Sequence, residues 1–159
     1  MAELPICDYE HPRRALGYLI RRVAKLSTAR VEAAFSDKDT TFTQWVVLAL
    51  VNSGTSNTSS ELARHTGHNS GAMTRLLDRL EERGMVEREP CTDDRRVMKL
   101  AVTPAGRDTL KEQAADVRAV WQDVLGDMPK EDVTRLLLLL TEVLSRFEAR
   151  EGIAPGCEA

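Results

Sequence analysis

The spacing of apolar residues along the chain predicts a protein that is mainly helical. Apolar side chains recur at intervals of three and four residues from Leu16 to Leu26, the pattern of one helix face. A first helix is therefore expected from Pro12 to about Phe35. After a polar break, the capping box Thr41-x-x-Gln44 opens a short, largely buried helix that includes the apolar run WVVLALV.

The middle of the chain is expected to contain two more short helices and a hairpin. The capping box Thr58-x-x-Glu61 starts one helix, and Asn69 is a good N-cap for the next. Gly84 stands where a helix end favours a left-handed residue. Two strand-like runs, MVERE and VMKLAV, follow and are separated by the polar turn PCTDDRR. This order of elements is the layout of a winged helix-turn-helix.

Two long helices are predicted after the hairpin. Thr103-Pro104 caps the first, which extends to about Leu125. The second spans residues 131–150 and contains five consecutive leucines, Leu136–Leu140, which cover more than one face, so this helix is expected to be buried on several sides. A second subunit could supply that cover, and a two-fold dimer is the simplest assembly. Alternatively, the leucines only close the core of the single chain.

The predicted fold class is mainly α with a small β-hairpin wing. Residues 1–159 are expected to form a single domain, in which residues 41–103 are a winged helix-turn-helix lobe and residues 12–36 and 104–150 are dimerisation helices. There is no run of about 18 apolar residues that would span a membrane. The N-terminus lacks the pattern of a signal peptide, so a cytoplasmic location is expected.

The net charge of −3 argues weakly against a nucleic-acid partner. The charge is unevenly placed, however. Residues 58–107 carry nine Lys/Arg against eight Asp/Glu, a net of +1, and the rest of the chain carries −4. Because DNA phosphates require local positive charge rather than a basic chain, the positions of individual arginines matter more than the total.

The helix from Asn69 to Arg83 combines an apolar face with a face suited to the major groove of DNA. Small polar residues near its N-terminus allow a close approach, Thr74 can touch a thymine methyl or a phosphate, and Arg75 can reach a guanine edge or a phosphate. The alternative is a solvated face whose arginines form i,i+4 ion pairs, and the helix alone favours that alternative. The outward residues are Ser70, Gly71, Thr74, Arg75 and Arg79.

The hairpin turn adds an argument for DNA binding over the solvated-face alternative. Arg95 and Arg96 are adjacent at its tip, where they repel each other unless an anion is near. Asp94 could orient one of them, and a narrow minor groove could receive it. The alternative is an ordinary charged turn. The turn and the helix together, in this order and spacing, favour DNA binding.

Several of these segments together resemble the multiple-antibiotic-resistance regulator (MarR) family. The likeness is carried by AMTRLLDRL at 72–80, GMVER at 84–88, DRR at 94–96 and LAVTPAG at 100–106, and it extends over the helical layout of residues 12–150. It implies a triangular homodimer whose terminal helices interlock and whose two winged lobes grip a pseudo-palindromic operator in double-stranded DNA.

The same likeness assigns roles at the DNA. Asp94 would pair with Arg96, which would enter the minor groove, and Arg95 would lie nearer phosphate. Ser59 and Ser60 would lie near the DNA backbone. With Asn69 and the outward residues of its helix, these positions make up the predicted DNA-binding site.

The resemblance also implies a small-molecule effector, a phenol or an aromatic acid, in a cleft between the DNA-binding lobe and the dimer helices. Trp45 is the candidate for stacking on such a ring, and Arg14, Arg21 or Arg22 for binding its carboxylate. Equally, Trp45 can be a core residue and the arginines a solvated face. The leading hypothesis is a sequence-specific transcription regulator, a homodimeric repressor that the effector releases from DNA.

Other functions have less support in the sequence. Three widely spaced cysteines, Cys7, Cys91 and Cys157, form neither a disulfide framework nor a metal motif. One branch of the family senses peroxide through a cysteine near the N-terminus, so a redox regulator acting through Cys7 is an alternative. A winged-helix module that binds only protein is another.

No metal or cofactor is expected. His65-x-x-His68, helped by Glu61, could contact a metal, but its place at a turn between helices favours a loop or phosphate role. Neither a catalytic triad pattern nor a phosphate-binding glycine loop is present, so the chain is not expected to be an enzyme.

Overall fold

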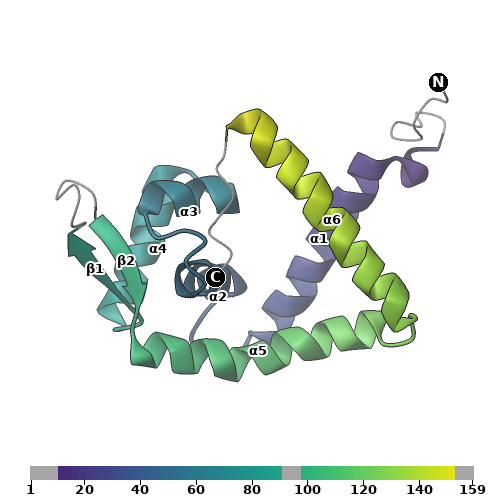
Figure 1. Ribbon diagram of the computed structural model, residues 1–159. Coiled ribbons are helices and arrows are strands. Elements are labelled where there is room, and N and C mark those ends of the chain that lie inside the picture. The colour runs from purple at the N-terminus through teal and green to yellow at the C-terminus, as the bar shows by residue number, and fades with distance from the viewer. Residues whose placement is uncertain (1–10, 91–97, 153–159) are drawn as a thin grey trace. The chain divides into compact units, whose positions relative to one another are not determined.

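The computed structural model describes residues 11–90 and 98–152 of the chain. Over these ranges the protein is mainly helical with one two-stranded antiparallel hairpin, so the predicted fold class is confirmed (Figure 1). In chain order the elements are the 3-10 helix η1 (Pro12–Arg14), α1 (Leu16–Ala34), α2 (Phe42–Asn52), α3 (Ser59–Thr66), α4 (Ser70–Glu82), β1 (Val86–Pro90), β2 (Met98–Val102), α5 (Pro104–Leu125) and α6 (Lys130–Glu151).

The chain divides into two compact units, residues 1–42 and 43–159, and each is described by itself. The expectation of a single domain, with a lobe at residues 41–103 and dimerisation helices at 12–36 and 104–150, stays a prediction. Of the helices that the structure describes, none is both long and apolar enough to cross a membrane.

The first unit consists of η1 and α1. Pro12 begins η1 rather than the long helix, because Ala15 has an extended backbone (φ −70°, ψ 130°) and no side chain that could cap α1. Val31 and Phe35 are buried, and the Phe35 ring meets the Phe42 ring edge-on with centroids 6.2 Å apart. The apolar face that predicted α1 is open to solvent in the single chain: its large side chains are 40–55% exposed, and they are Leu16, Tyr18, Leu19, Ile20, Val23 and Leu26.

In the second unit, α2, α3, α4, the hairpin and the start of α5 share one hydrophobic core. We call this part the winged lobe (residues 43–110). The hairpin pairs Val86 with Val102 and Arg88 with Leu100, so the valines and Leu100 face the core. The buried apolar residues are Val47, Leu48, Val51, Leu62, Ala63, Met73, Leu76, Leu77, Leu80, Met85, Val86, Leu100, Val102 and Leu110.

Side-chain caps set the helix ends of the winged lobe. The predicted capping box at Thr58 and Glu61 is present, and the side chain of Asn69 accepts the N–H of Ala72 at 2.8 Å. Gly84 has φ 66°, which an L side chain rarely adopts, so the turn from α4 into β1 requires glycine. Thr103 caps α5, with Pro104 at its first turn, as the sequence predicts.

A close approach of backbones fixes α5 to the hairpin. A Cβ placed on Gly106 would lie 2.2 Å from the carbonyl oxygen of Met85, so only glycine fits there. The Thr103 hydroxyl accepts the Gly106 N–H at 3.1 Å and donates to the Gly84 carbonyl at 2.6 Å. The first turn of α5 therefore belongs to the winged lobe.

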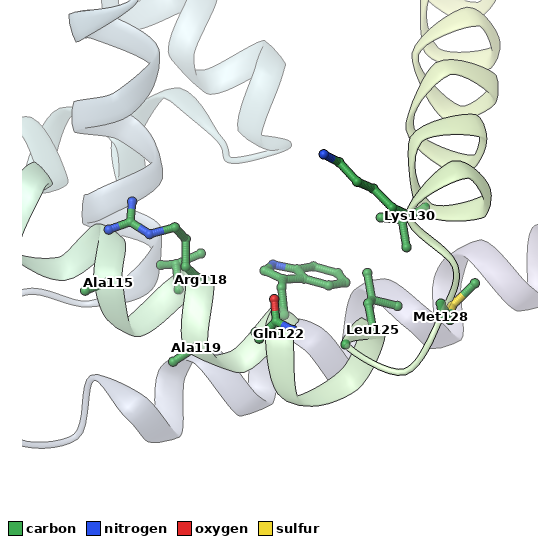
Figure 2. Close-up of a pocket in the computed structure, with 11 residues that line it drawn as sticks. Ala115, Arg118, Ala119, Gln122, Leu125, Met128 and Lys130 are labelled. Atoms are coloured by element: carbon green, nitrogen blue, oxygen red, sulfur yellow. The ribbon is translucent and has the colours of Figure 1, made fainter.

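The second half of α5 and all of α6 extend from this lobe. No residue of α6 is buried, and Leu136–Leu140 are 42–67% exposed. The alternative that these leucines only close the core of the single chain is therefore wrong, because the lobe core closes without them, and their burial against a second subunit stays a prediction. A pocket of about 740 Å³ lies where α5 turns into α6 (Figure 2).

Candidate nucleic-acid interface

Helix α4 separates apolar and polar residues onto two faces, as the sequence predicts. Met73, Leu76, Leu77 and Leu80 are buried in the lobe core. The residues predicted to face DNA are all exposed, and they are Asn69, Ser70, Gly71, Thr74, Arg75 and Arg79. The buried face anchors the helix, and the opposite face is left open to a partner.

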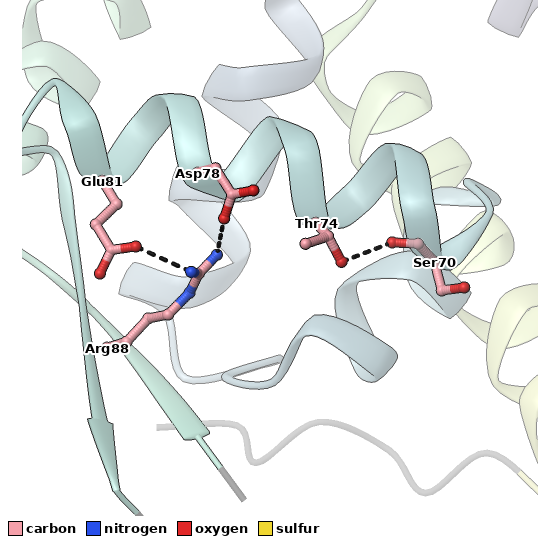
Figure 3. A network of polar contacts seen from close by, with 5 residues as sticks. All are labelled: Ser70, Thr74, Asp78, Glu81 and Arg88. Atoms are coloured by element: carbon pink, nitrogen blue, oxygen red, sulfur yellow. Dashed lines mark hydrogen bonds and ion pairs between the residues drawn. The ribbon is translucent and has the colours of Figure 1, made fainter.

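The N-terminal turn of α4 begins with three small residues, Ser70, Gly71 and Ala72. A Cβ on Gly71 would meet only side-chain atoms, Asn69 Oδ1 at 3.6 Å and Arg75 Nη1 at 3.9 Å, which are ordinary contacts. The fold therefore does not require glycine here. The Thr74 hydroxyl donates to the Ser70 carbonyl at 2.9 Å, so its proton is used within the helix while its methyl group stays free for an apolar contact (Figure 3).

Arg75 and Arg79 differ from Arg88 of strand β1 in having no carboxylate partner among the residues that the structure describes. Among the described residues, neither makes an ion pair, which contradicts the i,i+4 pairing that the solvated-face alternative requires. Instead, Asp78 and Glu81 both bind Arg88 from strand β1, at 2.6 and 3.0 Å (Figure 3). Two of the three acidic residues of α4 are thus engaged by the hairpin, and the third, Glu82, is exposed.

Arg88 is a residue whose role the sequence analysis missed. It joins the hairpin to α4 across ten residues of sequence, through a side chain that is 28% exposed. The available signal in the sequence was its place as the fourth residue of the strand-like run MVERE. Its pairing with Leu100 is seen only in the structure. The wing residues Asp94, Arg95 and Arg96 lie outside the described residues, between the paired strand ends Pro90 and Met98.

The start of α3 is held by Glu61. Its carboxylate accepts the N–H groups of Asn57 and Thr58 at 3.0 and 3.1 Å. Partial burial acts to raise the pKa of Glu61, but these hydrogen bonds, with the Thr58 side chain and the charge of Arg64, outweigh burial and hold the pKa below its usual value. Next to this cap, Ser60 is exposed and Ser59 is half-buried.

The two histidines near this turn have local partners. His65 Nδ1 lies 3.1 Å from the hydroxyl of Ser56, a fully buried residue in the loop before α3. His68 Nδ1 lies 3.1 Å from the Thr66 carbonyl. No group of three potential metal ligands occurs within residues 11–90 and 98–152. His65 thus fixes the loop before α3.

The predicted effector residues are divided between the two units. Arg14, Arg21 and Arg22 are exposed on the first unit, and Trp45 belongs to the second. Trp45 packs against the lobe core, and its indole N–H donates to the Leu110 carbonyl of α5 at 3.3 Å. The structure places Trp45 as the core alternative describes, and its role toward an effector stays a prediction. Cys7, Cys91 and Cys157 lie outside the described residues.

Comparison with known proteins identifies the family. Residues 40–98 match the model of the MarR family. The apo form of MarR from E. coli is 30% identical, with 81% of this chain and 96% of that chain covered and a TM-score of 0.70. The chain belongs to the MarR family. The resemblance drawn from the sequence is thereby confirmed, and the chain has the fold of a MarR family transcription regulator, a family that is not generally enzymatic.

Two related structures contain bound partners. A mutant of E. coli MarR complexed with operator DNA is 29% identical, covering 87% of this chain and 99% of that chain, with a TM-score of 0.69. The MarR family protein Rv2887 of Mycobacterium tuberculosis, in complex with p-aminosalicylic acid, is 30% identical, covering 80% of this chain and 97% of that chain, with a TM-score of 0.68.

Proposed function

We propose that this chain is a sequence-specific DNA-binding transcription regulator that acts as a homodimeric repressor. The observation that carries the proposal is the exposed face of α4. There a capped N-terminal turn of small residues precedes two arginines that form no ion pair with any residue that the structure describes. A helix of this kind fits a major groove, in which arginine reads guanine edges and binds phosphates. The relative with bound operator DNA supports the same use of the fold.

The residues of α4 and of its neighbouring elements would make different kinds of contact with DNA. Arg75 reaches base edges from the first half of the helix, and the Thr74 methyl contacts a thymine, since the Thr74 proton is already donated within the helix. Arg79, Ser59, Ser60, Asn69 and Ser70 lie near phosphates, and Gly71 lets the backbone approach. In the wing, Arg96, oriented by Asp94, would enter the minor groove and Arg95 would contact phosphate.

Fluorescence anisotropy with the DNA flanking the chain's own gene would test these roles. Arg96→Ala should nearly abolish binding. Arg75→Ala should lose about 1–3 kcal/mol and relax specificity at one base pair, whereas Arg79→Ala should weaken all sequences alike and reduce the salt dependence. Lys111→Ala, an exposed change on α5, is the matched control. Unchanged DNA affinity in both Arg75→Ala and Arg96→Ala would exclude this interface.

The exposed leucines of α6 support the homodimer. Five consecutive leucines and Phe147, which is 64% exposed, form more apolar surface than a monomer usually leaves in water. In a two-fold dimer the two α4 helices would be spaced by about one turn of DNA, roughly 34–36 Å. Leu138→Glu should convert the dimer to monomers in sedimentation experiments and abolish operator binding. A variant that still sediments as a dimer would argue against α6 as the interface.

We further propose that a small aromatic acid controls DNA binding by favouring one spacing of the two lobes. The relative that binds p-aminosalicylic acid supports this class of effector, and Arg14, Arg21, Arg22 and Trp45 are the candidates for contacting it. A gel-shift assay with a panel of aromatic acids tests the proposal. If no acid in the panel releases the DNA, this class of effector is wrong, while the DNA-binding proposal stands.

A further inference from the structure

The motif His65-x-x-His68, at the turn between α3 and α4, has no part in the DNA interface described above. From its sequence alone, a loop or phosphate role is expected for it. The structure separates the two rings. His65 is half-buried and lies against Ser56 in the loop before α3, whereas His68 is exposed at the end of the turn. Of the two rings, that of His68 is therefore the one open to a partner outside the chain.

The backbone fixes the place of His68. Gly67 ends α3 in the left-handed conformation, with φ 69°, and the His68 N–H donates to the Ala63 carbonyl of α3 at 3.0 Å. Asn69 follows and caps α4. His68 thus lies directly before the helix that is proposed to enter the major groove, and the phosphates of DNA border that groove.

The ring of His68 has one nitrogen engaged and one open. Nδ1 lies 3.1 Å from the Thr66 carbonyl, and because a carbonyl oxygen only accepts hydrogen bonds, Nδ1 carries a proton. In the neutral ring, Nε2 is then an acceptor without a proton to donate. The side chain makes no other hydrogen bond to the residues that the structure describes. Nε2 therefore meets a partner as an acceptor when the ring is neutral and as a charged donor when the ring is protonated.

The basic groups near this turn come from the two helices that it joins. Helix α3 contributes Arg64 and the titratable His65, both in its last turn. Helix α4 contributes Arg75, whose Nη1 lies 3.9 Å from the position of a Cβ on Gly71, so its guanidinium reaches back toward the start of the helix. Helix α2, which shares the core of the lobe, contains no ionisable residue. The turn is thus a basic part of the surface.

The carboxylates of α3 and α4 are engaged by other groups or lie away from the turn. Glu61 accepts backbone N–H groups at the start of α3, and α4 has no acidic residue in its first turn. The hairpin meets α4 where Arg88 binds Asp78 and Glu81, about two turns from the start of the helix. Within residues 11–90 and 98–152, no carboxylate forms an ion pair with His68. An anion for the protonated ring must come from elsewhere.

DNA offers two kinds of partner to Nε2. Phosphate and sugar oxygens only accept hydrogen bonds, so they require the protonated ring. The amino groups of adenine and cytosine donate, so they require the neutral ring. Base edges are contacted mainly from the recognition helix itself, whereas His68 lies outside α4, before its N-cap. Its position favours the phosphate.

We propose that protonated His68 binds a DNA phosphate through Nε2–H, beside the groove that α4 enters. This inference rests on the proposed function, since it needs the DNA. Its consequence is that the affinity for DNA rises as the pH falls through the range in which histidine gains its charge. The two histidines of the motif then have separate roles, His65 in the loop before α3 and His68 at the DNA backbone.

Fluorescence anisotropy at pH 6 and pH 8, with a duplex from the DNA flanking the chain's own gene, tests the proposal. The wild type should bind at least about fivefold more tightly at pH 6. The plot of log K against log salt should also be steeper at pH 6, by up to about 0.9 for each His68 at a phosphate. His68→Gln should lose both differences. His68→Lys, a permanent cation, should bind at both pH values about as tightly as the wild type at pH 6.

The other two histidines of the chain supply the controls, because His11→Gln and His65→Gln should keep the pH dependence of the wild type. Equal affinity of the wild type at both pH values overturns the proposal and leaves the proposed function intact. Weaker wild-type binding at pH 6 overturns it too, since the neutral ring then accepts from a base. So does a pH dependence that survives in His68→Gln or His68→Lys. A wild type that binds the duplex at neither pH refutes the proposed function and this inference together.

Discussion

The winged lobe and α6 belong to one unit of the chain, but the apolar residues of the lobe are buried and those of α6 are exposed. In the lobe, Leu62, Met73, Leu77 and Leu80 are each fully or almost fully buried. The predicted caps at Thr58, Asn69 and Thr103 are made. In α6, no residue is buried, although this helix has the longest leucine run of the chain. The lobe completes its own core, whereas α6 needs another surface to become as well packed.

This difference shows how function is divided in the molecule. A lobe that has its own core can present the polar face of α4 in a fixed geometry, because the opposite face of α4 is anchored in that core. An apolar helix that is open in the single chain makes assembly with a partner favourable, since burying each leucine contributes about 1.5–3 kcal/mol. The proposed DNA contacts and the proposed subunit contacts therefore lie on different elements of this unit, α4 and α6.

The largest expected difference is between buried and exposed leucines. Leu77→Ala should lower the free energy of unfolding by about 2–5 kcal/mol, because it leaves a cavity in the lobe. Leu138→Ala removes a side chain that is 67% exposed and should cost less than about 0.5 kcal/mol in the monomer. Urea unfolding at several protein concentrations separates the two. An equal loss for Leu138→Ala at concentrations where the chain is monomeric would contradict the contrast.

Two glycines of the lobe should respond in opposite ways. Gly106→Ala should lower the free energy of unfolding by about 1–3 kcal/mol, because the new Cβ meets the Met85 carbonyl and the hairpin must shift. Gly71→Ala has room and should leave stability unchanged or raise it by up to about 1 kcal/mol, while weakening operator binding. Thermal unfolding and DNA anisotropy on both variants provide the check. A loss of stability in Gly71→Ala would show that the fold, not DNA, requires that glycine.

Ion pairs offer a smaller contrast. Arg88→Met should cost about 0.5–1 kcal/mol of stability, since Arg88 binds two partly exposed carboxylates of α4. Arg146→Met on α6 removes an ion pair with Glu142, one turn away on an exposed surface, and should cost about 0.3–0.5 kcal/mol. Both costs should shrink at high salt. A double-mutant cycle with Asp78→Asn isolates the Arg88 interaction, and a coupling energy of zero would remove it as a link between hairpin and helix.

The smallest effect concerns pH. Because the pKa of Glu61 is lowered in the folded chain, its ionised form contributes stability that is fully present above the unfolded value of about 4.3. That contribution is lost as the pH falls through the lower, folded pKa. Glu61→Gln should therefore be less stable than the wild type at pH 7, and the gap should narrow toward pH 3 in urea unfolding curves. A gap that stays constant with pH would show that Glu61 acts without its charge.

Much of the lobe could be predicted because its signals are local. Three such signals are the capping box of Thr58 and Glu61, the N-cap Asn69 and the left-handed Gly84. Each involves residues that are three or four positions apart at most, so a short stretch of sequence is enough to predict it. The outward face of α4 follows from its buried face by helical periodicity. The wing arginines, the effector residues and the cysteines remain predictions.

Contacts over longer distances could not be predicted in this way. Arg88 pairs with Asp78 and Glu81 on a neighbouring element, although α4 alone suggested i,i+4 pairs with Arg75 and Arg79. Trp45 donates to a carbonyl 65 residues away. The partners of Arg88 and of Trp45 lie on other elements of the fold. Several side chains or carbonyls of the same chemistry could have filled each role, so the sequence did not indicate which one does.

The sequence by itself predicted the order of the helices and strands, the caps at Thr58, Asn69 and Thr103, and the apolar face of α4, and the opposite face of α4 stays a predicted DNA contact. Only the tertiary structure decided that Arg75 and Arg79 form no ion pair within residues 11–90 and 98–152, that α6 is open in the single chain, and that a pocket forms beside Gly126. The physical reason is that hydrophobic burial has no direction. A run such as Leu136–Leu140 can pack equally well against the core of its own chain or against a second subunit. The structure distinguishes the two, because the core of the lobe is already filled by other side chains.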